Sequence, residues 1–230
     1  MIGLRRKLSI SEAVRRVLSN HPSLLDCIKL GVVNYSSLAR VIVNEVKELG
    51  NFNKVSVNAV KMGIVRFSES LKSRKLMEDT IKELISRSTV ELQTDLKLIT
   101  LRRETLMIKL NELMHILMRA RFFQLTQGTK TFTLVVSEDV CDDVLRLFDK
   151  NAVEDVINDQ SAIILISPKD IISVPGVISY ITSLLSWYGV NITQIISCYV
   201  DTILVLNRSD ALKAYSLIEE LILQLRRIKT

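Results

Sequence analysis

VPGVISYITSLLSWYGVNI, residues 174–192, contains the only Pro-Gly dipeptide of the chain. Proline fixes one backbone dihedral and glycine permits close backbone approach, so this pair makes a turn at which a helix can begin. Apolar residues then recur at helical spacing until Gly189, which is placed to end the helix. We predict a helix over 176–188. Because the unpaired amides at a helix N-terminus attract carboxylates and phosphates, the loop before it can hold an anionic group.

The segments around this helix alternate between strand and helix patterns. From residue 90 apolar and polar residues alternate, which is typical of a half-buried strand. The alternation predicts that one face of this strand carries Val90, Leu92, Thr94, Leu96 and Leu98. Further strands are predicted over 122–127, 131–137, 153–157, 162–167, 192–199 and 202–206, and further helices over 106–119, 138–149 and 209–227.

This order predicts an α+β fold. The sequence strand, helix, strand, strand, helix, strand occurs once in full over 88–158, and again over 159–230 without its last strand. An antiparallel sheet with both helices on one face lets every strand bury one side and every helix one stripe. We therefore predict two ferredoxin-like βαββαβ units, the second lacking its last strand.

The first third of the chain has a helical pattern throughout. Its apolar residues recur at intervals of three and four, and its breaks, which contain Gly, Pro or Asn, fall at 20–22, 31–35 and 50–54. Ser9, Ser36 and Ser56 are predicted to cap helix N-termini. We predict an all-helical domain over 1–75, followed by a helical linker over 76–87.

Charge is distributed unevenly along the chain. Residues 1–87 hold 16 Lys or Arg and 8 Asp or Glu, whereas residues 88–230 hold 15 and 17. Such asymmetry is expected when one part of a protein meets an anionic polymer and another part does not. A basic solvated surface explains it equally well. Charge by itself leaves nucleic-acid binding open.

The succession of a strand, VPGV, a helix, YGVNI, a strand and DTILVL over residues 161–222 resembles the ACT domain, a small ligand-sensing module attached to enzymes and regulators of amino-acid metabolism. The resemblance implies that the glycine of the loop lets the carboxylate and amine of an effector contact backbone groups. It also implies that the Asn of GVNI approaches the effector from a neighbouring domain. The ligand contacts so implied are Val174, Pro175, Gly176, Val177, Asn191 and Ile192. The alternative is a loop that only turns the chain.

Residues 88–158 look like a degenerate second copy of the same domain. The order of elements fits, but the corresponding loop, 102–105, has no Pro-Gly. This copy is therefore expected to serve as a structural partner.

Two segments of the first third, YSSLARVIVNEVKEL (35–49) and VSVNAVKMGIVRFSESLKSRK (55–75), resemble the helix pair of helix-turn-helix and winged-helix DNA-binding domains. The resemblance implies that the second helix reads DNA, and helical spacing turns its polar and basic residues outward. The basic residues that follow extend the positive surface along the DNA backbone. The candidate DNA contacts are Ser56, Asn58, Lys61, Arg66, Lys72, Arg74 and Lys75. The alternative is a helical bundle that docks another protein.

The sequence offers no catalytic, metal or cofactor site. His21 and His115 have no obvious partners, and the phosphate-binding, dinucleotide-binding and serine-hydrolase motifs are missing. Cys27, Cys141 and Cys198 lie far apart, which argues against a zinc site or a disulfide framework and is typical of a reducing cytoplasm. No run of about 18 apolar residues predicts a membrane span. We expect a cytoplasmic protein that is not an enzyme and has no cofactor.

These features predict a ligand-sensing regulatory protein of amino-acid metabolism, which binds an amino acid at ACT interfaces and double-stranded DNA through its helical domain. The domain order resembles that of predicted archaeal regulators of amino-acid metabolism. A homodimer or higher homo-oligomer is expected, because helix-turn-helix proteins read paired half-sites and ACT sheets commonly associate. The alternative is a regulatory subunit that docks a biosynthetic enzyme through its helical domain and binds no DNA.

Overall fold

The computed structural model describes residues 8–72 and 77–228. The chain forms two compact units that meet in the sequence between residues 76 and 77. Each unit is described by itself below.

The described part of the first unit contains four helices: α1 (Ile10–Ser19), α2 (Pro22–Lys29), α3 (Tyr35–Leu49) and α4 (Val57–Lys72). They pack around one core that takes its main residues from α1, α3 and α4. The hydroxyl of Ser9 accepts a hydrogen bond from the amide of Glu12, and that of Ser56 accepts one from Ala59, as their positions predicted. Asn34 caps α3 in place of the predicted Ser36, because its side chain reaches the two amides that open the helix.

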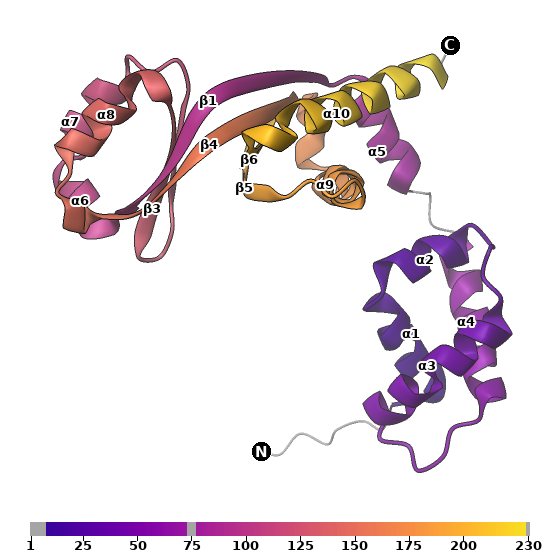
Figure 1. Ribbon diagram of the computed structural model, residues 1–230. Coiled ribbons are helices and arrows are strands. Elements are labelled where there is room, and N and C mark those ends of the chain that lie inside the picture. The colour runs from indigo at the N-terminus through magenta and orange to yellow at the C-terminus, as the bar shows by residue number, and fades with distance from the viewer. Residues whose placement is uncertain (1–7, 73–76, 229–230) are drawn as a thin grey trace. The chain divides into compact units, whose positions relative to one another are not determined.

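The second unit contains one antiparallel sheet with helices around it (Figure 1). Its elements in chain order are α5 (Met77–Ser86), β1 (Thr89–Arg102), α6 (Arg103–Ile108), α7 (Leu110–Leu117), β2 (Phe123–Gln127), β3 (Thr131–Ser137), α8 (Glu138–Leu147), η1 (Lys150–Ala152), β4 (Val153–Ile166), η2 (Lys169–Ile172), α9 (Val177–Trp187), β5 (Ile192–Cys198), β6 (Asp201–Asn207) and α10 (Arg208–Ile228). The strand order is β2-β3-β1-β4-β6-β5. The sheet is continuous, and the predicted boundary between 158 and 159 lies inside β4.

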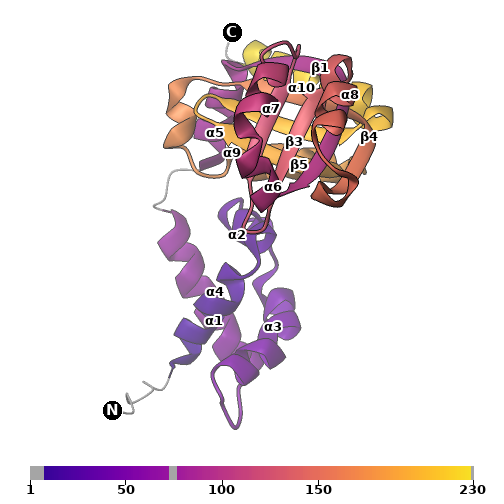
Figure 2. The same cartoon turned by 90° about the vertical axis from the view of Figure 1, so that its left-hand side faces the viewer.

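The two central strands, β1 and β4, are each 14 residues long and run through both ends of the sheet. Helices α6, α7 and α8 cover one end of the sheet, and α5, α9 and α10 cover the other, as Figures 1 and 2 show from two directions. Each helical group has its own core with the strands that it covers. The closing strand that the sequence lacks at its C-terminal end is supplied by the first half of β1, which pairs with the second half of β4.

Backbone irregularities in β1 and β4 change which side chains share a face. Asp95 and Asp159 have positive φ angles of 58° and 52°, and the pairing of β1 with β4 shifts register beside them. An inserted residue moves the alternation of a strand by one. Val90 and Leu92 therefore pack with α5, α9 and α10, whereas Leu96, predicted on the same side, packs in a third core with β3, β5 and β6.

This third core lies on the face of the sheet that carries no helices, and there the sheet curls. Its buried residues come from β1, β3, β4, β5 and β6. The outermost strands β2 and β5 meet through side chains, since the Gln194 amide donates a hydrogen bond of 2.9 Å to the Thr126 hydroxyl. The curl therefore buries apolar side chains that an open sheet would leave exposed.

Two further predictions differ from the structure. The segment 76–87, predicted as a helical linker, does contain a helix, α5, but its Ile81, Leu84 and Ile85 are buried in the core of the second unit. The sequence alone did not show this packing, because an amphipathic helix does not reveal which surface it packs on. The helix predicted over 106–119 begins earlier, at Arg103, and is broken at Lys109 into α6 and α7.

Candidate functional site

The Pro-Gly loop, defined here as residues 167–176, leads from β4 into α9. Gly176 has a φ of 96°, a left-handed conformation that residues with a side chain adopt only with strain. It precedes Val177, the first residue of α9, and its carbonyl accepts the first helical hydrogen bond, from the Tyr180 amide at 2.8 Å. No side chain caps this helix N-terminus. The first amides of α9 are therefore available to a ligand, together with the positive end of the helix dipole.

A pocket of about 610 Å³ opens at this helix N-terminus. It brings together four of the six predicted ligand contacts, namely Val174, Pro175, Gly176 and Val177. The remaining wall comes from residues that the sequence had not singled out: Ile171, Ile172, Ile178, Ser179, Ser197 and Tyr199. Within the part of the chain that the structure describes, this lining carries apolar groups and hydroxyls and no charged side chain. It therefore fits a small molecule that brings its own charge.

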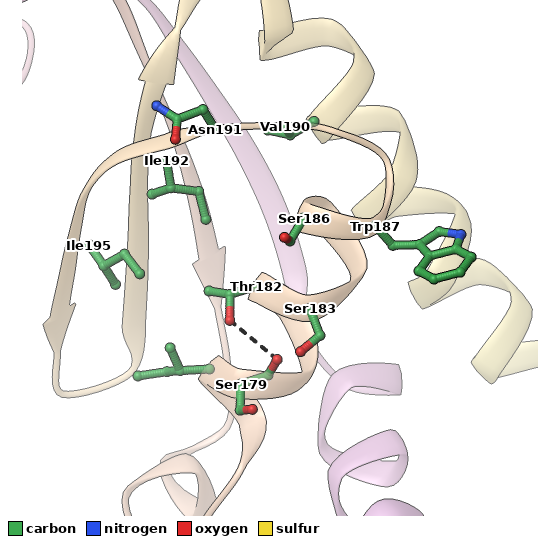
Figure 3. A pocket seen from close by; sticks show the side chains of 10 residues that line it. Ser179, Thr182, Ser183, Ser186, Trp187, Val190, Asn191, Ile192 and Ile195 are labelled. Atoms are coloured by element: carbon green, nitrogen blue, oxygen red, sulfur yellow. Dashed lines mark hydrogen bonds between the residues drawn. The ribbon is translucent and has the colours of Figure 1, made fainter. Parts of the chain in front are cut away.

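The other two predicted contacts, Asn191 and Ile192, line a neighbouring groove of about 920 Å³ between α9 and β5 (Figure 3). The pocket and this groove, called the α9–β5 groove, share Ile178 and Ser179. Within one copy of the chain the predicted residues thus fall into two adjoining hollows.

The α9–β5 groove has an unusual helical wall. Small hydroxyl residues recur on α9 at one-turn spacing and form a row along the groove: Ser179, Thr182, Ser183 and Ser186. The opposite wall is Ile192 and Ile195 of β5, which is an outermost strand of the sheet. Trp187, at the end of the row, is 87% exposed. Figure 3 shows its ring pointing away from the β5 wall of the groove. A hydroxyl at i, i+3, i+4 and i+7 is the signal in the sequence that could have located this face.

A separate group of charged residues surrounds the bulges of β1 and β4. They line a hollow of about 310 Å³ and include Asp95, Lys97, Glu138, Asp159 and Arg208. Arg208 forms an ion pair with Asp95, and the Lys97 Nζ lies 3.3 Å from Glu138 Oε1. The Thr94 hydroxyl, followed by Arg208, holds the pKa of Asp95 below its ordinary value. Four of these five charged side chains are therefore paired with one another within the hollow.

The predicted DNA contacts lie at the N-terminus of α4, along the helix and beyond its end. The Ser56 hydroxyl caps the helix, and Arg66 Nη1 donates a hydrogen bond of 3.3 Å to the hydroxyl of Ser11 on α1. Asn58 is exposed and Lys61 is half-buried. Lys61 and Arg66 are five positions apart, which puts them about 140° apart around the helix, because each residue turns it by about 100°. Lys72 belongs to α4, and Arg74 and Lys75 lie outside the described residues.

The outward face of α4 lies between these two basic residues. It presents Met62, which is 49% exposed, and Glu69. Asn58 lies on this same face, between Lys61 and Arg66 around the helix axis. Glu69 and Met62 thus place one acidic and one apolar side chain among the predicted contacts, and DNA binding by these residues stays a prediction.

Residues 8–72 and 77–228 offer neither a metal-binding cluster nor a membrane-spanning helix. No cluster of three or more His, Cys, Asp or Glu side chains is placed to hold a metal ion there. No helix in these ranges is long and apolar enough to span a membrane. Cys141 is buried, which raises the pKa of its thiol, whereas Cys198 is exposed.

Comparison with known proteins gives matches only among solved structures. No family model matches the chain, and no curated protein does. The chain is 18% identical to the aspartate kinase of Clostridium acetobutylicum, with 58% of this chain and 34% of that chain covered and a TM-score of 0.46. It is 13% identical to the regulatory subunit of aspartate kinase from Thermus thermophilus, with 58% and 97% covered and a TM-score of 0.44. It is 14% identical to the regulatory subunit of aspartate kinase from Thermus flavus, with 57% of this chain and 95% of that chain covered and a TM-score of 0.49.

Proposed function

We propose that this chain is a ligand-sensing regulatory protein of amino-acid metabolism, and that a free α-amino acid binds at the Pro-Gly loop. The observation that carries the proposal is the uncapped N-terminus of α9, which opens at the left-handed Gly176 into a pocket without charged side chains. The effector's carboxylate lies against the first amides of α9, where the helix dipole favours a negative charge by about 0.3–1 kcal/mol or more.

The rest of the pocket suits the remaining parts of such a molecule. Ile171, Ile172 and Val174 receive an apolar side chain, and the hydroxyls of Ser197 and Tyr199 accept hydrogen bonds from the ammonium group. A volume of about 610 Å³ lies in the range typical of small-molecule sites, roughly 300–1,000 Å³. No nucleophile and base meet in this pocket, so binding without chemistry is the role that its residues support.

We further propose that a second copy of the chain covers the α9–β5 groove. An outermost strand presents unpaired backbone groups, a row of hydroxyls allows close approach, and Trp187 offers a large exposed apolar surface. In such a pair Asn191 and Ile192 of one copy approach the pocket of the other. This arrangement accounts for the separation of the six predicted contacts within one chain.

The output of the regulator is assigned to the first unit. We propose that it binds double-stranded DNA, and the support for this is the excess of Lys and Arg before residue 88. The alternative, docking on a biosynthetic enzyme, is supported by the apolar and acidic outward face of α4. DNA affinity that falls steeply with salt separates the two outputs, since neutralised phosphates release counterions.

A thermal-shift screen tests the effector proposal. The purified chain is melted with each of the twenty amino acids in turn, and one or two related ones are expected to raise the melting temperature, because binding to the folded state stabilises it by about 2.7 kcal/mol at a hundredfold excess over Kd. The stabilisation should disappear in Ser197→Leu, which fills the pocket from an exposed position of β5. It should persist in Gly189→Ala, which adds a side chain outside the pocket. A screen without any shift contradicts the proposal.

A further inference from the structure

Helix α5 lies directly behind the Pro-Gly loop. Its Ile81 is only 7% exposed, and a Cβ added at Gly176 would lie 3.0 Å from the Ile81 Cδ1 atom. Leu84 and Ile85 of the same helix are buried in one core with α9 and α10. The loop therefore rests against α5 at the residue whose conformation opens the pocket.

The C-terminal end of α5 is tied to the beginning of the same loop. Arg87 Nη2 lies 2.9 Å from Asp170 Oδ2, in the short helix η2 that supplies Ile171 and Ile172 to the pocket. The buried hydroxyls of Ser88 and Ser167 are 3.0 Å apart and hydrogen-bonded. Together with the Ile81 contact, these ties hold α5 to both ends of the loop.

A third support of α5 comes from α10, at residues that do not line the pocket. The Arg226 guanidinium donates hydrogen bonds to the carbonyl of Ser86 at 2.9 Å and to that of Ser88 at 2.7 Å. A cation at the C-terminal end of a helix satisfies its last carbonyls and complements its dipole. Arg226 thus gives a way to disturb α5 without altering the pocket.

We propose that α5 is the element that couples the effector pocket to the rest of the chain. The Pro-Gly loop and α5 order together, so an effector that fixes the loop also fixes the docking of α5, and loosening of α5 weakens the pocket by the same coupling. The first unit is joined to the second through the residues just before α5. Occupancy of the pocket therefore reaches the first unit through the docking of this helix. The proposal rests on the effector site described above and assigns its route of regulation.

Hydrogen exchange on the full-length protein tests the coupling without any ligand. Arg226→Ala is expected to speed amide exchange in α5 (80–86) by about tenfold and, by coupling, in the loop (169–176) several-fold. Helices α6 and α7, which belong to another core, should not change. Arg226→Lys keeps the charge but loses the two-pronged geometry, and its effect should be intermediate.

The matched control is Arg102→Ala, which removes an exposed ion pair, Arg102 with Glu154 at 2.6 Å, in the same unit and away from α5. It should leave exchange in both α5 and the loop unaltered. If Arg226→Ala speeds exchange in α5 while the loop keeps the wild-type rate, the two do not order together and the coupling is refuted.

A second arm separates failure of the coupling from failure of the effector site. The twenty amino acids are each added to the wild-type protein at one fixed millimolar concentration, and exchange is measured again. Protection of both the loop and α5 by one amino acid supports coupling, and protection of the loop alone refutes it while the effector site stands. If none protects the loop, the effector site fails, and the Arg226→Ala result still decides whether loop and α5 are coupled.

Discussion

Gly176→Ala is expected to destabilise the second unit by about 2–5 kcal/mol. A left-handed residue with a side chain costs about 1–2 kcal/mol relative to glycine, and Gly176 has a φ of 96°. The new Cβ lies 3.0 Å from Ile81 Cδ1, which is closer than an ordinary contact, so the buried Ile81 has to move. Overpacking of this kind adds about 1–3 kcal/mol. For a unit of this size the melting temperature should fall by roughly 4–20 °C.

The matched control is Gly189→Ala. Gly189 lies just beyond α9 with a φ of 75°, and an added Cβ there meets no atom within 4 Å. Gly189→Ala should lower the free energy of unfolding only by the cost of a side chain in the left-handed conformation, about 1–2 kcal/mol. Denaturation is followed by circular dichroism, since the only tryptophan, Trp187, is 87% exposed and changes little on unfolding.

A double-mutant cycle isolates the contact itself. Ile81→Ala alone removes a buried side chain and costs about 2–5 kcal/mol, but it also vacates the space that the new Cβ needs. Gly176→Ala should therefore cost about 1–3 kcal/mol less in the Ile81→Ala background than in wild type. Equal costs for Gly176→Ala and Gly189→Ala, with no change in the Ile81→Ala background, refute the reasoning.

Three further perturbations test other parts of the account. Ser183→Arg puts a charge in the hydroxyl row, so the mass measured by light scattering at micromolar concentration should fall from that of a dimer to that of a monomer. A monomeric wild type contradicts the proposal that a second copy covers the α9–β5 groove. Lys61→Ala with Arg66→Ala should lower DNA affinity and flatten its salt dependence; a wild-type protein without salt-dependent DNA affinity favours docking on an enzyme. Asp95→Asn keeps a residue type that tolerates positive φ but removes the charge. The pKa of Asp95 is lower in the folded protein than in the unfolded chain, so its charge stabilises the fold at pH values above the ordinary pKa. This stabilisation is lost as the pH falls through the lowered pKa. The unfolding curves of variant and wild type should therefore differ at neutral pH and converge in acid.

Local features of the fold were predictable from the sequence. The helix predicted over 176–188 is α9, Val177–Trp187, and Gly189 ends it in a left-handed conformation. The order of strands and helices from β1 to α10 also follows the predicted order, apart from the break at Lys109, two short 3₁₀ turns and the union of the strands predicted over 153–157 and 162–167 into β4. These features depend on the spacing of apolar residues and on turn chemistry, both of which act over a few residues.

Long-range features could not be predicted in the same way. Pairing of the first half of β1 with the second half of β4 joins residues 69 to 77 positions apart, and the bulges at Asp95 and Asp159 shift faces without a glycine to mark them. The proposed binding site likewise combines residues that are close in sequence with residues that only the fold brings near. The four contacts around Gly176 are neighbours in sequence, whereas Ser197 and Tyr199 reach the pocket through the sheet and Ile81 through the packing of α5.

The central claim is that the carboxylate of a free amino acid lies at the N-terminus of α9. Amide NMR shifts of Val177, Ile178 and Ser179 measure this most directly, during titration with the amino acid that stabilises the chain most and with its carboxamide, which lacks the negative charge. The account predicts large shifts at these three amides with the amino acid and little response to the carboxamide. Equal responses to both compounds, or shifts confined to other parts of the chain, contradict it.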